Sequence, residues 1–105
     1  MIRFRRGRFH ELVERQLDLF TTDESSLLDE AGDAERAWTR TGRDDAEELY
    51  GDWQLVADAI GERLLDLREA YAGMLEEDAA GEYRAAFDRG ARRRFPRYTD
   101  ILGQR

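Results

Sequence analysis

A chain of 105 residues with a net charge of −7 and no cysteine has room for one domain with a modest core. The lack of cysteine excludes disulfides and thiolate metal sites, so a disulfide-stapled secreted domain is not expected. Charged residues make up 39% of the chain, but the apolar residues recur periodically, which favours helices over disorder. The longest apolar run, from Ala70 to Leu75, is far too short for a membrane span, and the basic start lacks the apolar core of a signal peptide. We therefore expect a cytoplasmic protein.

All basic residues are arginine, and the chain has neither lysine nor asparagine. Arginine codons are mostly GC-rich, so a bacterial source with a high-GC genome is the simplest explanation. A salt-adapted organism is the rival explanation, because the net charge is strongly negative. Both explanations concern the source of the protein rather than its function.

The first part of the chain predicts a basic arm followed by two helices. Residues 1–7 are the basic N-terminal arm, and from 8 to 20 apolar residues recur at helical spacing. Thr21 and Glu24 match a capping box, in which one helix ends and another begins. The second helix is expected over 24–41, followed by Gly42 at the C′ position.

The strongest pattern lies in the stretch 44–75, where large or apolar residues are spaced alternately by four and three. This 3.5-residue repeat is typical of a helix that coils around a partner. It predicts a long amphipathic helix whose buried seam comprises Ala46, Tyr50, Trp53, Ala57, Ile60, Leu64, Leu67, Tyr71 and Met74.

The same spacing precedes Gly42, which predicts an antiparallel hairpin between 8–41 and 44–75. Folding the chain back at Gly42 places small residues opposite large ones, a pattern that favours close packing. The expected pairs are Trp38 with Ala46, Ala34 with Tyr50, Ala31 with Trp53 and Leu27 with Ala57. Glu24 would face Ile60 across this seam, so the first arm should kink near residues 21–25.

A shorter helix is expected over 78–95, with Asp78 as its N-cap and Pro96 ending it. Residues 96–105 are the C-terminal tail. The predicted fold is thus all-α: a single domain over 1–105 in which a long helical hairpin and a C-terminal helix form a three- or four-helix bundle. The last helix would shield only part of the hairpin, leaving Leu49, Leu55, Val56, Leu65 and Leu75 uncovered, and a homodimer would cover them.

No catalytic, cofactor-binding or metal-binding residue is predicted. Di-metal carboxylate bundles need Glu-x-x-His pairs on two helices, whereas this chain has one histidine, His10, preceded at that offset by Gly7. We interpret His10 as a packed or surface residue. Ser25 and Ser26 lie in a helix cap without a recognisable activating histidine.

Charge is the remaining signal, because an acidic body carries two basic ends. The arginines either offset the acidic body or attract an anion such as nucleic acid, against the long-range repulsion of a negative chain. The candidate residues for binding a partner or an anion are Arg3, Arg5, Arg6, Arg8, Arg92, Arg93, Arg94 and Arg97.

The sequence therefore predicts a non-catalytic helical assembly or adaptor protein that acts through protein–protein contacts, as a homodimer. The alternative is a nucleic-acid-associated regulatory protein that uses its arginine-rich ends. No cofactor and no metal is expected under either hypothesis.

Overall fold

The computed structural model describes residues 7–104, with only the backbone described for Gln104. Its elements are α1 (His10–Asp23), α2 (Ser25–Arg40), α3 (Arg43–Ala72), α4 (Glu77–Arg94) and the short 3₁₀ helix η1 (Asp100–Gln104). No strand occurs within residues 7–104, so the predicted all-α class is confirmed. None of the described helices is long and apolar enough to cross a membrane.

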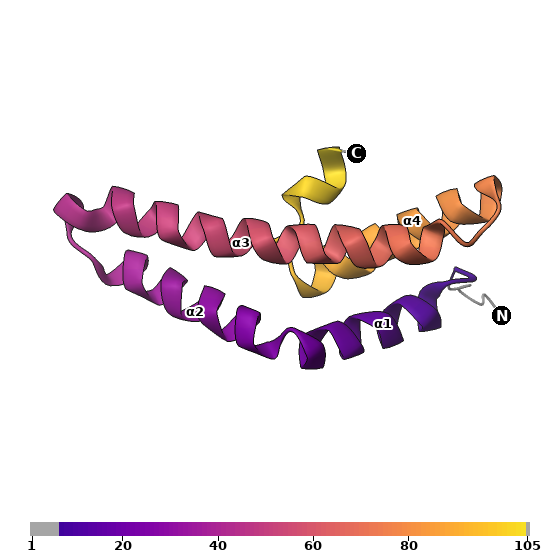
Figure 1. Ribbon diagram of the computed structural model, residues 1–105, viewed down its shortest axis with the longest axis horizontal. Helices are drawn as coiled ribbons and strands as arrows, with labels where there is room; N and C mark the ends of the chain where they lie inside the picture. Colours follow the sequence, from indigo (N-terminus) through magenta and orange to yellow (C-terminus); the bar gives the residue numbers. More distant parts are fainter. Residues whose placement is uncertain (1–6, 105) are drawn as a thin grey trace, which may run out of the picture.

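Helix α3 is the axis of the molecule, and α2 packs antiparallel to its N-terminal half (Figure 1). The predicted hairpin is therefore observed for α2, whereas α1 packs mainly against α4 instead of α3. Helix α4 returns beside the C-terminal half of α3, where it packs against both α3 and α1. The turn between α2 and α3 consists of Thr41 and Gly42, both in extended backbone conformations. Gly42 follows the C-cap residue Thr41 and so occupies the predicted C′ position, but its φ is −77° and it also serves as the N-cap residue of α3.

The kink expected in the first arm lies at Glu24, between α1 and α2, where φ is −107° and ψ is 24°. The predicted capping box is wrong, because the Thr21 hydroxyl donates instead to the Leu17 carbonyl at 2.9 Å. The Glu24 carboxylate accepts hydrogen bonds from Arg63 on α3, at 3.0 and 3.1 Å. The polar interruption of the seam is therefore a surface ion pair, and Ile60 beside it is fully buried.

The core is concentrated at the end of the molecule where α1, α3 and α4 pack together, which we call the three-helix end. Tyr83 and Phe87 of α4 are fully buried there, together with Leu17 of α1. Gly90 allows α1 and α4 to approach closely, since a Cβ at this position would lie 2.9 Å from Val13 Cγ1 and 3.1 Å from Leu17 Cδ1. Small and large residues thus alternate across the α1–α4 contact.

Helix α4 begins one residue earlier than expected and ends before Phe95. Its N-cap residue is Glu76 rather than Asp78, which lies in the first turn, where its charge is favoured by the helix dipole. After Pro96 the chain turns back onto α3 and packs at Gly61. A Cβ on Gly61 would lie 2.8 Å from the Tyr98 carbonyl oxygen, so the C-terminal segment needs a glycine at this contact.

The predicted seam of α3 is buried in its middle and exposed toward both ends. Ala57, Ile60 and Leu64 are buried, whereas Ala46, Trp53, Leu67 and Tyr71 are half-buried. The expected burial of Tyr50 and Met74 is wrong, because these side chains are 42% and 73% exposed. Near Tyr50 only α2 packs alongside α3, and Met74 lies beyond the last turn of α3.

Candidate interaction surfaces

Most of the predicted arginine candidates within the described residues form intramolecular ion pairs. Arg93 Nη2 donates to Glu14 Oε1 at 2.6 Å, and Arg94 Nη2 lies 2.8 Å from Asp18 Oδ1. Arg97 pairs with Glu35 of α2. These contacts join α4 and the segment that follows it to the acidic faces of α1 and α2.

The remaining candidates divide into three groups. Arg8 Nη1 lies 3.7 Å from Glu82 Oε2, and its guanidinium stacks over the Phe9 ring at 4.9 Å. Arg92 is exposed and makes no ion pair within residues 7–104. The candidates outside the described residues are Arg3, Arg5 and Arg6.

A buried arginine that the sequence pattern did not single out holds α3 to α4. Arg68 is 3% exposed, and its Nη1 donates to both carboxylate oxygens of Asp88, at 2.8 and 3.1 Å. Its Nε donates to Glu69 Oε2 at 2.9 Å. Glu69 also accepts a two-point contact from Arg84, whose hydrogen bond is the main reason that the pKa of the Glu69 carboxyl is lowered. This cluster is a structural clamp between two helices.

Tyr83 forms a further buried polar contact between helices. Its hydroxyl donates to Gln16 Oε1 of α1 at 2.7 Å, while its ring lies 5.6 Å from Phe9 and 4.7 Å from Tyr71. Burial raises the pKa of the Tyr83 hydroxyl to about 12, because the charged phenolate would lose its hydration. The tyrosine therefore stays neutral at physiological pH and serves packing.

The opposite end of the molecule, which we call the arm, comprises α2 and residues 43–56 of α3. Ala31 is the only residue classed as buried across 25–56. Leu49 and Val56 are half-buried, and Leu55 is 72% exposed. The arm is a two-helix structure without the third helix that covers the rest of α3.

Three large aromatic residues gather inside the arm. The ring centroid of Trp38 lies 5.2 Å from that of Tyr50 and 6.4 Å from that of Trp53, and Tyr50 and Trp53 are 5.7 Å apart. Within residues 7–104 the indole nitrogens of Trp38 and Trp53 are buried without a hydrogen-bond acceptor. Such unpaired donors weaken the arm relative to the three-helix end.

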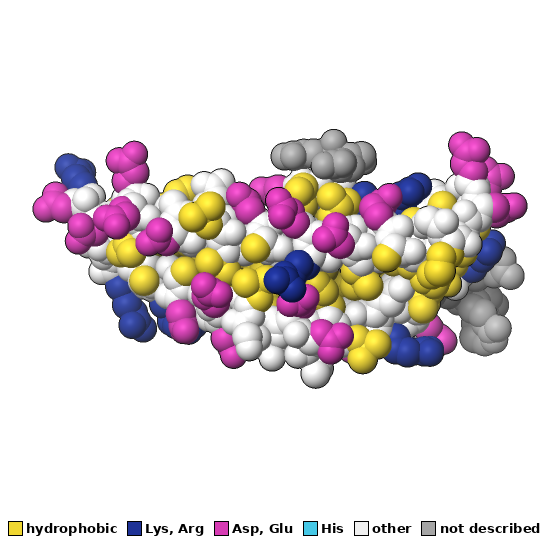
Figure 2. Space-filling model, viewed as in Figure 1, with side chains coloured by type: hydrophobic (Ala, Val, Ile, Leu, Met, Phe, Trp, Pro, Cys, Tyr) yellow, Lys and Arg dark blue, Asp and Glu magenta, His cyan; other side chains and the backbone are white. Residues whose placement is uncertain are grey.

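The surface between α3 and the α1–α2 side is apolar along much of its length. Figure 2 shows hydrophobic side chains following this seam on the face away from α4, with acidic side chains along its borders. Residues 25–56 contain nine acidic residues against three arginines. The arm therefore combines apolar surface with strong negative charge.

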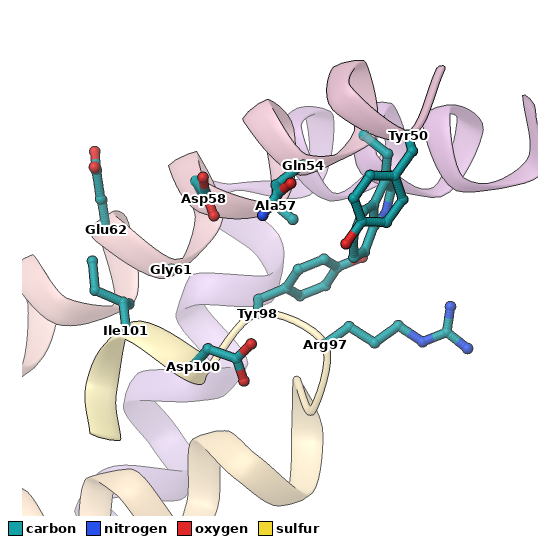
Figure 3. Close-up of a pocket in the computed structure, with 11 residues that line it drawn as sticks. Tyr50, Gln54, Ala57, Asp58, Gly61, Glu62, Arg97, Tyr98, Asp100 and Ile101 are labelled. Atoms are coloured by element: carbon teal, nitrogen blue, oxygen red, sulfur yellow. The ribbon is translucent and has the colours of Figure 1, made fainter. Parts of the chain in front are cut away.

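A recess of about 430 Å³ lies where the arm meets the C-terminal segment. Figure 3 shows α3 on one side and the segment around Tyr98 on the other, with the Tyr98 ring extending toward Tyr50. The wall from α3 comprises Tyr50, Trp53, Gln54, Ala57, Asp58, Gly61 and Glu62, and the opposite wall comprises Arg97, Tyr98, Asp100 and Ile101.

Two further hollows are smaller, with volumes of about 400 and 300 Å³. One lies beside Arg92 and Thr99, and the other is lined by His10, Arg89 and Arg93. Within residues 7–104 no three histidine, aspartate or glutamate side chains gather closely enough to hold a metal ion. Comparisons with protein-family models, curated proteins and solved structures find no match.

Proposed function

We propose that this protein is a non-catalytic helical assembly or adaptor protein that acts through protein–protein contacts of its arm, as a homodimer. The observation that carries the proposal is the apolar surface of the arm, where Leu55 is 72% exposed and Tyr50 is 42% exposed. Large apolar side chains that remain exposed in one region are typical of a surface that a second chain covers.

The alternative, a nucleic-acid-associated regulator, draws less support. Arg8, Arg93, Arg94 and Arg97 each have a carboxylate partner within the chain, so binding phosphate would require breaking those pairs. The arm itself is acidic and would repel a nucleic acid. Ion pairing thus favours the interpretation in which these arginines offset the acidic body.

Sedimentation velocity over a dilution series tests the proposal, with Leu55→Glu as the disrupting variant. Leu55 is 72% exposed, so a glutamate there is compatible with the fold. Met74→Glu is the matched control, because Met74 is 73% exposed but lies beyond α3, at the opposite end from the arm.

We expect the wild-type chain and Met74→Glu to sediment as dimers at micromolar concentration, and Leu55→Glu as a monomer. A monomeric wild-type chain throughout the series would contradict the homodimer. Equal weakening by both substitutions would show that the arm is not the contact surface.

A further inference from the structure

We propose that the recess between α3 and the C-terminal segment binds an arginine side chain presented by a basic amphipathic helix of a partner protein. This inference deepens the proposed function and rests on it. It names the chemistry of the partner and the place where that partner is anchored.

The shape of the recess suits a single large side chain with its flanking backbone. Its volume of about 430 Å³ falls within the range of about 300–1,000 Å³ that is usual for ligand sites. Tyr50 and Trp53 contribute aromatic rings from α3, and Tyr98 contributes a third from the opposite wall. A planar guanidinium stacks on such rings more effectively than other charged groups.

The charge of the lining selects a cation. Asp58, Glu62 and Asp100 line the recess, and none of them makes an ion pair within residues 7–104. The one cation in the lining, Arg97, is already paired with Glu35. Figure 3 shows Asp58 on α3 and Asp100 on the opposite segment, with Tyr98 between them. An incoming guanidinium would therefore meet both aromatic rings and unpaired carboxylates.

The position of the recess favours a helical partner. Helix α4 ends at Arg94, and the recess begins beyond it, at the edge of the arm. The arm lacks a third helix and is strongly acidic, so its charge complements that of a basic amphipathic helix. Such a helix would lie along the recess, between α3 and the C-terminal segment, beside the surface that a second copy covers.

The test uses a fluorescein-labelled helical peptide of about 18 residues, with leucines on one face, glutamines elsewhere and a single central arginine. A second peptide carries citrulline, the neutral isostere of arginine, at that position. Fluorescence anisotropy with the full-length protein at low ionic strength measures both affinities. Free arginine amide serves as a competitor that lacks the helix.

The protein variants are Asp58→Asn/Asp100→Asn and the matched control Asp29→Asn/Asp66→Asn. Both pairs remove two exposed carboxylates that make no ion pair within residues 7–104, but the control pair lies outside the recess. Circular dichroism establishes that each variant is folded.

We expect the arginine peptide to bind about tenfold more tightly than the citrulline peptide, and Asp58→Asn/Asp100→Asn to remove that difference. The control variant should retain it. Equal binding of the two peptides, or equal weakening by both variants, would overturn the inference. Full competition by free arginine amide at concentrations matching the peptide would show that no helix is recognised, and would overturn it as well.

Failure of this inference can be distinguished from failure of the proposed function. A dimer that Leu55→Glu dissociates, together with no preference for arginine, would remove the recess as an anchor and leave assembly through the arm intact.

Discussion

The three-helix end and the arm use the same kind of apolar repeat on α3, yet they bury it to different degrees. At the three-helix end Leu64, Tyr83 and Phe87 are fully buried between three helices. In the arm the large side chains of Trp38 and Trp53 are half-buried, and Tyr50 is 42% exposed. The difference teaches that a heptad pattern specifies which residues face a neighbour, whereas the number of neighbours decides how much water is excluded.

The two regions also differ in how their polar groups are satisfied. The buried Arg68 at the three-helix end has carboxylate partners on both α3 and α4. In the arm two indole donors are buried without an acceptor within residues 7–104. An unpaired buried donor costs about 1–3 kcal/mol. Hydrogen exchange should therefore be faster in the arm than at the three-helix end.

The largest expected difference between the two regions comes from removing an aromatic ring in each. Phe87→Ala should cost about 3–5 kcal/mol in the free energy of unfolding, because Phe87 is fully buried. Trp53→Ala should cost about 1–2 kcal/mol, since its side chain is half-buried. Urea denaturation followed by circular dichroism measures both. Equal losses in the free energy of unfolding would contradict the difference in packing between the three-helix end and the arm.

The next effect concerns the clamp between α3 and α4. Asp88→Ala should cost about 3 kcal/mol, because it removes a partner from a guanidinium that is 3% exposed. Asp66→Ala on α3 is the control: Asp66 is exposed and without an ion pair within residues 7–104. Its cost should stay below about 0.5 kcal/mol. A small loss for Asp88→Ala would show that Glu69 alone satisfies Arg68.

Alkaline pH should lower the free energy of unfolding through Tyr83, which lies at the three-helix end. The pKa of Tyr83 is raised from 10.0 to about 12 in the folded state, so the unfolded chain releases this proton first. Stability from this group is therefore complete below pH 10 and falls as the pH rises through about 12, by up to about 1.4 kcal/mol per pH unit. Urea unfolding at a series of pH values measures the slope.

Tyr83→Phe is the control for that titration. It removes the ionisable hydroxyl and keeps the ring, although it also loses the hydrogen bond to Gln16. The variant should be less stable at neutral pH by about 1 kcal/mol and should lose less stability in alkali. An identical alkaline slope in both proteins would assign the effect to other groups.

The smallest effects come from two glycines of α3. Gly61→Ala should cost about 1–2 kcal/mol, because the added Cβ would lie 2.8 Å from the Tyr98 carbonyl oxygen and 3.0 Å from Ile101 Cγ2. Gly51→Ala in the arm should stabilise the helix by about 0.5–1 kcal/mol, since no atom outside the adjacent residues and the backbone of its own helix lies within 4 Å of the added Cβ. Thermal unfolding measures both. Stabilisation by Gly61→Ala would show that the C-terminal segment does not need this contact.

The sequence was sufficient to predict the all-α class and the kink at Glu24, because both follow from local periodicity. It was less informative about burial. Tyr50 and Met74 follow the same spacing as Leu64, and no neighbouring residue in the sequence indicates that fewer helices cover them. Arg68 lies one position from the predicted seam, and its burial depends on Asp88, twenty residues away in the chain. Tertiary partners of this kind are not visible in a 3.5-residue repeat.

The candidate surfaces were predicted in part. The sequence singled out the arginines as charged ends, but it could not show that Arg93, Arg94 and Arg97 meet carboxylates of α1 and α2. The recess was missed, because its walls come from segments about forty residues apart. Gly61 carried a signal, since an unexplained glycine in a helix often marks a close approach of another segment.

The contact between Arg97 and Glu35 couples the C-terminal segment to the packing of α2 on α3. Arg97 pairs with Glu35 of α2, while the backbone at Tyr98 lies close to Gly61 of α3. The position of the C-terminal segment therefore depends on both α2 and α3. Movement of α2 away from α3 would break the ion pair of Arg97, which belongs to one wall of the recess, so the shape of the recess depends on contact between these two helices.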